Sequence, residues 1–284
     1  MIFLPELPEV ETVRKGLEQL IQGKEIQSVD VFWNRIIDYP DVTVFKSSLI
    51  GQTILEIKRR GKYLIFKLSD ADLISHLRME GKYEYQLTSP EKKSKHTHVV
   101  FHFTDGSQLS YHDVRKFGRM ALVPKDTAIS YKAVALLGPE PTDSTFLLED
   151  FENKLARSSR AIKTQLLDQT MVAGLGNIYA NEVLWEAKIH PEQPANTLTK
   201  KEIIRLRKTI IAVLDRAVKA GGTTIRSYVN ALGEAGHFQV SLNAYGKTNQ
   251  PCPRCLTPIV KIKVGQRGTH FCPNCQKLRR RKIK

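Results

Sequence analysis

Four cysteines restrict the folding of this chain more than any other feature, because all of them lie in one short segment near the C-terminus. They form two C-x-x-C pairs, Cys252 with Cys255 and Cys272 with Cys275, and sixteen residues separate the pairs. Each tight turn brings two sulfurs to one side, and two such turns complete the tetrahedron that zinc accepts. Two disulfides are the alternative, but disulfides are rare inside cells. We therefore predict one structural Zn²⁺ bound by these four residues.

The same end of the chain is strongly basic. No Asp or Glu occurs from Ala235 to Lys284, whereas Lys and Arg recur throughout. The whole chain carries a formal net charge of +15, which favours a polyanionic partner such as nucleic acid. A solvated basic tail or a ribosome-like surface would have the same charge, so the charge indicates no particular chemistry. No apolar run approaches the roughly 18 residues of a membrane span, so we expect no membrane partner.

The N-terminal half has the pattern of a helix followed by a sheet. From Pro8 onward, apolar residues recur at helical spacing among charged ones, which predicts an amphipathic helix. These residues are Val10, Val13, Leu17 and Leu20. Short β-rich runs follow at Val29–Phe32, Thr53–Ile57, Tyr63–Leu68, His98–Phe103 and Gln108–Tyr111. Asp105-Gly106 is typical of a hairpin turn, so we predict an N-terminal β-sandwich flanked by helices over residues 1–137.

The second half changes from strands to helices. Two prolines and several turn formers in Gly138–Asp143 indicate a linker, which we place at residues 138–150. An apolar stripe from Ile203 to Val218 stops at Gly221-Gly222, as expected at the C-terminal end of a helix. We predict a multidomain α+β protein with a helical domain over residues 151–240 and a zinc-finger β-hairpin over residues 241–284.

Short segments spread along the whole chain form an ordered set. The most specific is PELPEVET, which starts at Pro5. The others are Gly61–Tyr63, His76–Gly81, Lys95–His98, Tyr111–Gly118, Leu137–Pro141, Gly174–Glu182 and Gln266–Thr269. Together with the cysteine pairs, this set resembles the formamidopyrimidine-DNA glycosylases, bifunctional enzymes that excise oxidised purines. Any one segment could match by chance, but the common order makes chance an inadequate explanation.

The resemblance implies four catalytic residues. Pro5 matches the N-terminal proline whose secondary amine attacks C1′ of the damaged nucleotide and forms an iminium with the opened sugar. Glu6 matches the acid that protonates the sugar ring oxygen. Lys62 matches the proton donor for β-elimination, and Arg267 matches the residue that assists δ-elimination. A guanidinium is a poor acid, so we expect Arg267 to act mainly as a phosphate clamp.

The position of Pro5 departs from the family pattern. A proline inside a chain has an amide nitrogen, whose delocalised lone pair cannot attack carbon. We therefore expect the active protein to begin at position 4, read as the initiator Met and then removed, so that Pro5 becomes the free terminus. The alternative is an ordinary loop or first-turn proline.

An enzyme that works on a stacked base rotates it out of the duplex and fills the gap. Met79, Arg115 and Phe117 match the family residues that do so. They supply an apolar wedge, a cation for the orphaned base and a ring that can stack. Apart from the resemblance, Met79 and Phe117 would be interpreted as core residues and Arg115 as a surface charge.

Phosphate contacts are also implied by the resemblance. The matching residues are His96, Lys163, Asn177 and Arg267. Asn177 follows Gly174 and Gly176 at a helix start, where free N–H groups suit a phosphate; the family calls this arrangement a helix-two-turn-helix. A plain helix cap would also explain Asn177.

The segment after Gly221-Gly222 corresponds to the family loop that closes over the everted base. Its hydroxyls and N–H groups would distinguish an oxidised purine, whose N7 becomes a donor, from guanine, whose N7 only accepts. The candidate pocket residues are Thr223, Thr224, Ser227 and Tyr228, with Glu80 as a further candidate.

We thus expect a base-excision repair enzyme that is both a DNA-formamidopyrimidine glycosylase and an abasic-site lyase. Its expected partner is double-stranded DNA containing an oxidised base or an abasic site, and we expect a monomer in the bacterial cytosol or nucleoid. One alternative is the related endonuclease VIII, which prefers oxidised pyrimidines; Leu7 and the Arg115-x-Phe117 pair argue against it. The other is a DNA-binding zinc protein without catalysis.

Overall fold

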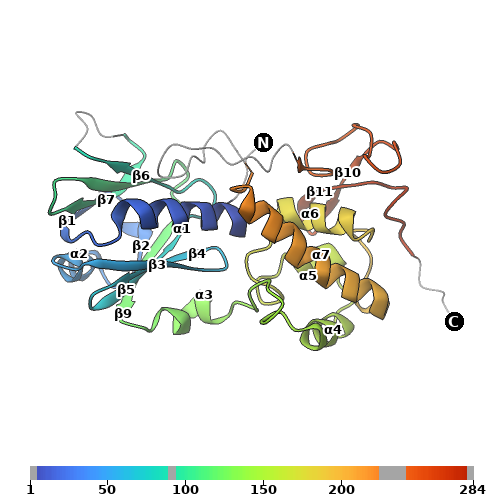
Figure 1. Ribbon diagram of the computed structural model, residues 1–284, viewed down its shortest axis with the longest axis horizontal. Helices are drawn as coiled ribbons and strands as arrows, with labels where there is room; N and C mark the ends of the chain where they lie inside the picture. The colour runs from blue at the N-terminus through green and yellow to red at the C-terminus, as the bar shows by residue number, and fades with distance from the viewer. Residues whose placement is uncertain (1–4, 89–93, 224–240, 280–284) are drawn as a thin grey trace. The chain divides into compact units, whose positions relative to one another are not determined.

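The computed structural model describes residues 5–88, 94–223 and 241–279 (Figure 1). The chain divides into two compact units, Met1–Ala135 with Gly221–His237 and Leu136–Ala220 with Phe238–Lys284. It therefore passes from the first unit to the second just before the predicted linker. The division into four parts with bounds at 137, 150 and 240 stays a prediction.

The first unit is built mainly of strands. Its helices are α1 (Leu7–Ile21), α2 (Val42–Leu49) and α3 (Lys132–Ala135), with short 3-10 helices at Asn34–Ile36 and Ala128–Ser130. Its strands are β1 (Ile26–Val31), β2 (Ile37–Tyr39), β3 (Ile54–Arg60), β4 (Tyr63–Leu68), β5 (Ala71–His76), β6 (Lys82–Gln86), β7 (Thr97–Phe103), β8 (Gln108–His112) and β9 (Arg119–Pro124). These strands form a four-stranded sheet of order β1-β7-β8-β6 and a five-stranded sheet of order β2-β9-β5-β4-β3.

The predicted N-terminal helix is confirmed as α1. It buries Val10, Val13, Leu17 and Ile21 and packs against β3 and β4 (Figure 1). One hydrophobic cluster contains these side chains together with residues of both sheets, such as Phe66 of β4 and Phe101 of β7. The predicted sandwich is therefore confirmed, with α1 completing its core. Covering one face of an amphipathic helix with a sheet removes apolar surface from water, which stabilises both elements.

Four strands are absent from those predicted from the sequence: β2, β5, β6 and β9. Every residue of β5 except His76 is buried, and β9 has the same nearly continuous burial in its interior. Both lie in the middle of the five-stranded sheet. A strand covered on both faces has no alternation of apolar and polar residues, so its periodicity does not identify it. The predicted turn at Gly106 is confirmed, with φ +85° and its N–H donating to the Phe103 carbonyl at 3.0 Å.

The second unit is helical, as predicted. It contains α4 (Leu148–Ala156), α5 (Ile162–Leu166), α6 (Asn177–Glu186), α7 (Lys200–Lys219) and a 3-10 helix at Ala195–Thr197. α6 contacts α5, α7 and β11, and every residue from Ile178 to Trp185 is buried. A helix that is buried on all sides is the centre of its unit. Helix α4 begins inside the predicted linker.

α7 confirms the predicted apolar stripe and its end. The helix begins after Thr199, whose hydroxyl accepts the Glu202 N–H at 3.4 Å while the Glu202 carboxylate accepts the Thr199 N–H at 2.8 Å. This reciprocal capping satisfies donors that the first turn leaves free. The helix ends at Lys219, before Gly221 and Gly222 with φ of +75° and +76°, values that favour glycine.

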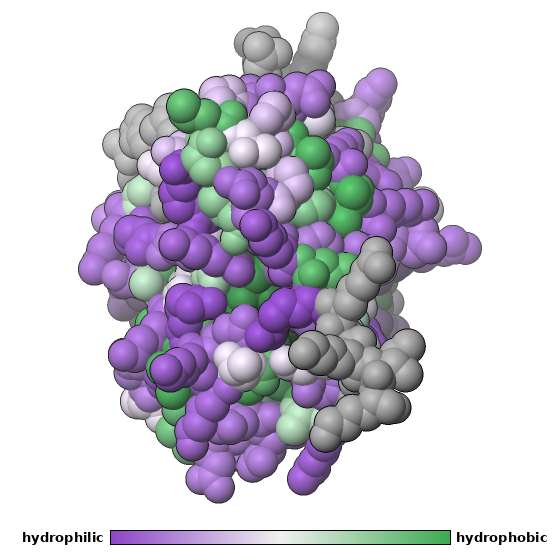
Figure 2. Space-filling view, turned by 90° about the vertical axis from the view of Figure 1, so that its right-hand side faces the viewer, coloured by the Kyte–Doolittle hydropathy of each residue, from purple (hydrophilic) through white to green (hydrophobic). Residues whose placement is uncertain are grey.

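The zinc-finger hairpin consists of β10 (Val260–Val264) and β11 (Arg267–Phe271), paired antiparallel. Among the described residues, no helix is long and apolar enough to cross a membrane. Hydrophilic residues predominate on the face drawn in Figure 2, and hydrophobic ones form smaller groups between them.

Candidate functional site

The start of α1 holds the two N-terminal candidates. Pro5 and Glu6 are both buried, and Glu6 is the N-cap residue of the helix. The Glu6 N–H donates to Glu9 Oε2 at 2.9 Å. The other carboxylate oxygen of Glu9 accepts the Thr223 N–H at 2.8 Å and the Thr223 hydroxyl at 2.9 Å. Glu9 therefore joins the segment that carries Pro5 and Glu6 to the first residue of the predicted base-contacting segment.

This junction requires a glycine. A Cβ at Gly222 would lie 2.9 Å from Glu9 Oε1, and the residue has a φ of +76°. Both the space and the backbone conformation exclude a side chain.

Lys62 lies in the tight turn between β3 and β4. The turn is connected to α1 by an ion pair, because Arg59 Nε lies 2.9 Å from Glu11 Oε2. The same guanidinium donates through Nη1 to the Gly61 carbonyl at 2.9 Å. Gly61 has a φ of +56°, so the turn that presents Lys62 uses the left-handed region. The Arg59–Glu11 ion pair thus connects the helix that begins after Glu6 to the turn that carries Lys62.

His76 is a neighbour of this turn. It pairs with Tyr63 across β4 and β5, and the two rings meet edge to face with centroids 4.4 Å apart. Its Nδ1 accepts the Arg78 N–H at 2.9 Å. Burial, with smaller effects of the Arg78 and Lys62 charges, lowers the pKa of His76 to about 3. The imidazole is therefore neutral at physiological pH.

Met79 and Glu80 lie in the turn that follows β5, and both are half-buried. The turn is closed by the Gly81 N–H, which donates to the Leu77 carbonyl at 3.0 Å. Met79 is thus not among the fully buried core residues, and its predicted contact with bases stays a prediction.

A buried aspartate holds the loop that carries Arg115 and Phe117. Asp113 is 1% exposed; its Oδ1 accepts the Arg115 N–H at 3.0 Å and its Oδ2 accepts the Gly118 N–H at 2.7 Å. Its carbonyl accepts from His98 Nε2 at 2.7 Å. Its own N–H donates to the carbonyl of the predicted phosphate contact, His96, at 3.0 Å.

The two predicted base-contacting side chains of this loop lie together. The Arg115 guanidinium is 4.9 Å from the centroid of the Phe117 ring. Phe117 is 45% exposed, so the alternative of a core residue is wrong for it. Between them, Lys116 has a φ of +59° and places its ammonium 4.2 Å from the centroid of the Trp33 ring. The loop is thus fixed by Asp113 and Trp33 while an arginine and an aromatic ring remain accessible.

In the second unit, residues far apart in the sequence meet at one carbonyl. Gly268 O accepts from Lys163 Nζ at 3.0 Å and from Asn177 Nδ2 at 3.2 Å. Gly268 directly follows the exposed Arg267 at the start of β11. Asn177 is the first residue of α6, and Gly176 is the N-cap, so the alternative in which Asn177 caps the helix is wrong. Its buried Oδ1 has no hydrogen-bond partner within the described residues.

Lys163 contacts the hairpin that carries Arg267. Its side chain is fully buried, and its ammonium also donates to Thr269 Oγ1 at 2.7 Å. The predicted phosphate contact of Lys163 stays a prediction. The structure has Lys163 holding the hairpin segment that carries Arg267.

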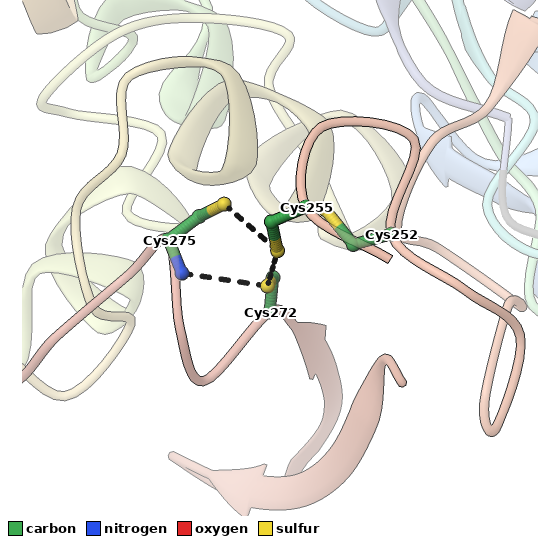
Figure 3. A group of neighbouring side chains, drawn as sticks. All are labelled: Cys252, Cys255, Cys272 and Cys275. Carbon is green, nitrogen blue, oxygen red and sulfur yellow. Dashed lines mark hydrogen bonds between the residues drawn. The ribbon is translucent and has the colours of Figure 1, made fainter. Parts of the chain in front are cut away.

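The four cysteines form one cluster, with all Sγ atoms within 4.8 Å of one another (Figure 3). They are free thiols, so the disulfide alternative is wrong. Cys255 Sγ lies 3.4 Å from both Cys272 Sγ and Cys275 Sγ. Zn–S bonds of about 2.3 Å require sulfurs about 3.8 Å apart in a tetrahedron, so the cluster fits one structural zinc ion. A zinc ion bound here would join the two knuckles.

The sequence patterns do not identify three residues that shape the candidate site. Glu9 and Trp33 act through contacts with distant segments, whereas the Asp113 carboxylate holds its own loop. For Glu9 a local signal exists, since a glutamate three residues after an N-cap is typical of a capping box. Thr224, Ser227 and Tyr228 lie outside the described residues.

Family models of known proteins match three consecutive parts of the chain. The N-terminal domain of formamidopyrimidine-DNA glycosylase matches residues 4–120, and its H2TH domain matches residues 137–229. A zinc finger found in FPG and IleRS matches residues 249–278.

Similar proteins match almost end to end. The formamidopyrimidine-DNA glycosylase of Enterococcus faecalis is 63% identical over 281 residues, which cover 99% of this chain and 100% of the relative. A solved complex between the Lactococcus lactis Fpg and an abasic site containing DNA has a TM-score of 0.91 and 49% identity, covering 96% of this chain and 99% of that one. A structure of MutM with carbocyclic 8-oxo-G containing DNA has a TM-score of 0.90 and 48% identity, covering 96% and 100%.

Proposed function

The chain belongs to the formamidopyrimidine-DNA glycosylase family, and we propose that it removes oxidised purines from duplex DNA and then cleaves the strand. The observation that carries this proposal is the likeness, over 96% of the chain, to solved complexes with abasic-site and 8-oxo-G DNA. The substrates are 8-oxoguanine and formamidopyrimidines in double-stranded DNA. Because the relatives reported above are bacterial, the place of action is the bacterial cytosol or nucleoid.

The proposed chemistry begins with the Pro5 nitrogen, which attacks C1′ of the damaged nucleotide. The glycosidic bond breaks, the base leaves, and Glu6 protonates the ring oxygen as the sugar opens. The resulting iminium acidifies the 2′ hydrogen, whose loss expels the 3′ phosphate with Lys62 as the proton donor. A second elimination expels the 5′ phosphate, and the Arg267 guanidinium binds the phosphate charge. Glu6 is buried beside Pro5 at the start of α1, which supports its role next to the reacting sugar.

This chemistry requires Pro5 to be the first residue of the working enzyme. An amide nitrogen has no lone pair available for attack. We therefore propose that the catalytic form lacks residues 1–4.

Met79, Arg115 and Phe117 are proposed to occupy the gap left by the everted nucleotide. The accessibility of Phe117 and its contact with the Arg115 guanidinium support this role, because a stacked cation and ring present one flat surface to neighbouring bases. The fixed loop conformation supports it further, since little ordering is then needed on binding.

Contacts with the phosphates of the DNA backbone are proposed for His96, Asn177 and Arg267. Asn177 is the first residue of α6, and the N-terminus of this helix offers N–H groups to a phosphate. Lys163 is proposed to position Arg267 through Gly268 and Thr269. The proposed base contacts are Glu80, Thr223, Thr224, Ser227 and Tyr228.

A labelled duplex with one 8-oxoguanine tests the proposal. Protein that begins at Pro5 should nick this duplex and leave phosphate at both ends, and borohydride should trap a covalent complex. Protein that begins at Met1, verified by intact mass, is the matched control and should do neither. Glu6→Gln should lose base removal more than cleavage at a preformed abasic site, because that site no longer carries a base.

The other outcomes distinguish the alternatives. Activity on thymine glycol alone would support an endonuclease VIII. Binding without nicking or trapping, for protein that begins at Pro5, would support a DNA-binding protein without catalysis.

A further inference from the structure

Trp185 of α6 reaches the zinc-binding cysteines. Its indole Nε1 donates a hydrogen bond to Cys252 Sγ at 3.4 Å. The ring is 8% exposed and packs in one hydrophobic cluster with Ala244, Cys252, Ile259 and Cys272. An indole N–H is only a donor, and in this buried place the Cys252 sulfur is its acceptor.

The first cysteine knuckle holds the indole in this orientation. Arg254, which lies between Cys252 and Cys255, places its guanidinium carbon 3.8 Å from the centroid of the Trp185 ring. The same guanidinium donates through Nη2 to the Trp185 carbonyl. The first knuckle therefore contacts the indole at two places: Arg254 lies against the ring face, and Cys252 accepts from the ring N–H. A substitution in the knuckle should thus affect the indole, and a substitution of Trp185 should affect the knuckle.

Other residues of α6 also bind the zinc module. The buried Glu182 carboxylate accepts the N–H groups of Asn243, Ala244 and Tyr245 at 2.9, 2.9 and 2.7 Å. Asn181 Oδ1 accepts the His270 N–H at 2.7 Å. These bonds attach backbone, whereas Trp185 is the α6 side chain that bonds to a metal-binding sulfur.

We propose that Trp185 stabilises the zinc-bound Cys252 thiolate and thereby slows zinc release, so that metal retention depends on helix α6. A hydrogen bond to a thiolate offsets part of its negative charge and fixes the sulfur in the position the metal needs. Residues that orient metal ligands in this way contribute strongly to metal affinity. The inference goes beyond the proposed function, because it concerns metal binding and holds whether or not the protein cleaves DNA.

Trp185→Phe in the full zinc-loaded chain tests the proposal. Phenylalanine keeps an aromatic ring and removes the N–H donor. Zinc transfer to the chromogenic chelator 4-(2-pyridylazo)resorcinol gives the release rate, and competition with the same chelator gives the affinity. We expect the affinity to fall by roughly 10- to 100-fold and the release to accelerate. Trp33→Phe is the matched control: Trp33 lies in the first unit, and its substitution should leave both quantities unchanged.

Cobalt substitution separates the hydrogen bond from a general loosening of the fold. At saturating Co²⁺, Trp185→Phe should shift the sulfur-to-cobalt charge-transfer band to lower energy, because the thiolate loses a donor. The far-ultraviolet circular dichroism should stay that of the wild type. An unshifted band together with an unchanged zinc release rate would overturn the proposal.

Arg254→Gln provides a second variant in case Trp185→Phe does not fold. It removes the guanidinium from the indole face but keeps every cysteine. Zinc release should be faster than in the wild type. A wild-type rate in this variant, measured on folded protein, would contradict the role of the held indole.

Discussion

Asp113 makes the loop with Arg115 and Phe117 a rigid element, and its removal should have a large effect. Its two carboxylate oxygens accept the Arg115 and Gly118 N–H groups at 3.0 and 2.7 Å. Hydrogen bonds to a charged group contribute about 1.5–3 kcal/mol each. Asp113→Ala should therefore lower the free energy of unfolding of the first unit by roughly 3–5 kcal/mol. At about 3 °C per kcal/mol, this lowers the melting temperature by roughly 10 °C.

Two matched variants define the origin of the effect. Asp113→Asn keeps one oxygen acceptor but turns an amide donor toward the other N–H, so about half of the destabilisation or more should remain. Asp70→Ala removes an exposed aspartate of the same unit and should change the free energy by less than about 0.5 kcal/mol. Urea unfolding can be followed by fluorescence in the otherwise wild-type chain, because Lys116 of the loop contacts the Trp33 ring.

The affinity for DNA provides an independent test of whether Asp113 holds the loop. Re-ordering one or two loop residues on binding costs about 1–2 kcal/mol each. Asp113→Ala should therefore bind abasic-site duplex about tenfold or more weakly, below its unfolding temperature. Wild-type stability and wild-type affinity in this variant would refute the reasoning, because the loop would then owe its conformation to other contacts.

Three further predictions follow from buried groups. Acidification should destabilise the first unit as the pH falls from about 6.5 toward 3, because unfolded His76 binds a proton that the folded form excludes. His76→Asn keeps an acceptor for the Arg78 N–H. In a plot of the free energy of unfolding in urea against pH, this variant should lower the slope by up to about 1.4 kcal/mol per pH unit. Glu182→Ala leaves three N–H donors without their carboxylate and should lower the free energy of unfolding of the second unit by about 3–5 kcal/mol. Glu186→Ala breaks an exposed ion pair and should lower it by under about 1 kcal/mol. Equal losses of the two variants in urea unfolding would contradict this prediction. Gly118→Ala would place a Cβ 1.9 Å from the Tyr111 hydroxyl and should cost about 1–3 kcal/mol, and an unchanged melting temperature would show that the tyrosine moves freely.

Local patterns in the sequence determined several features of this protein. The cysteine spacing identified the metal site because each knuckle is a local turn. The periodicity identified α1 and α7 because one face of each helix meets the core. The glycine pair after Lys219 identified the end of α7, because a positive φ favours glycine at those positions.

Only the tertiary structure decided the partners that these elements bring to one another. Nothing near Glu9 in the sequence indicates Thr223, which follows more than 200 residues later. The sequence near Lys163 does not indicate its bonds to Gly268 and Thr269. The sequence near Trp185 does not indicate the bond from its N–H to Cys252. Strands β5 and β9 were hidden for the same reason, since burial on both faces depends on neighbours. Periodicity and turn residues indicate which face of a segment is exposed to solvent and where the segment ends. Hydrogen-bond partners depend instead on which distant segments the fold places beside it.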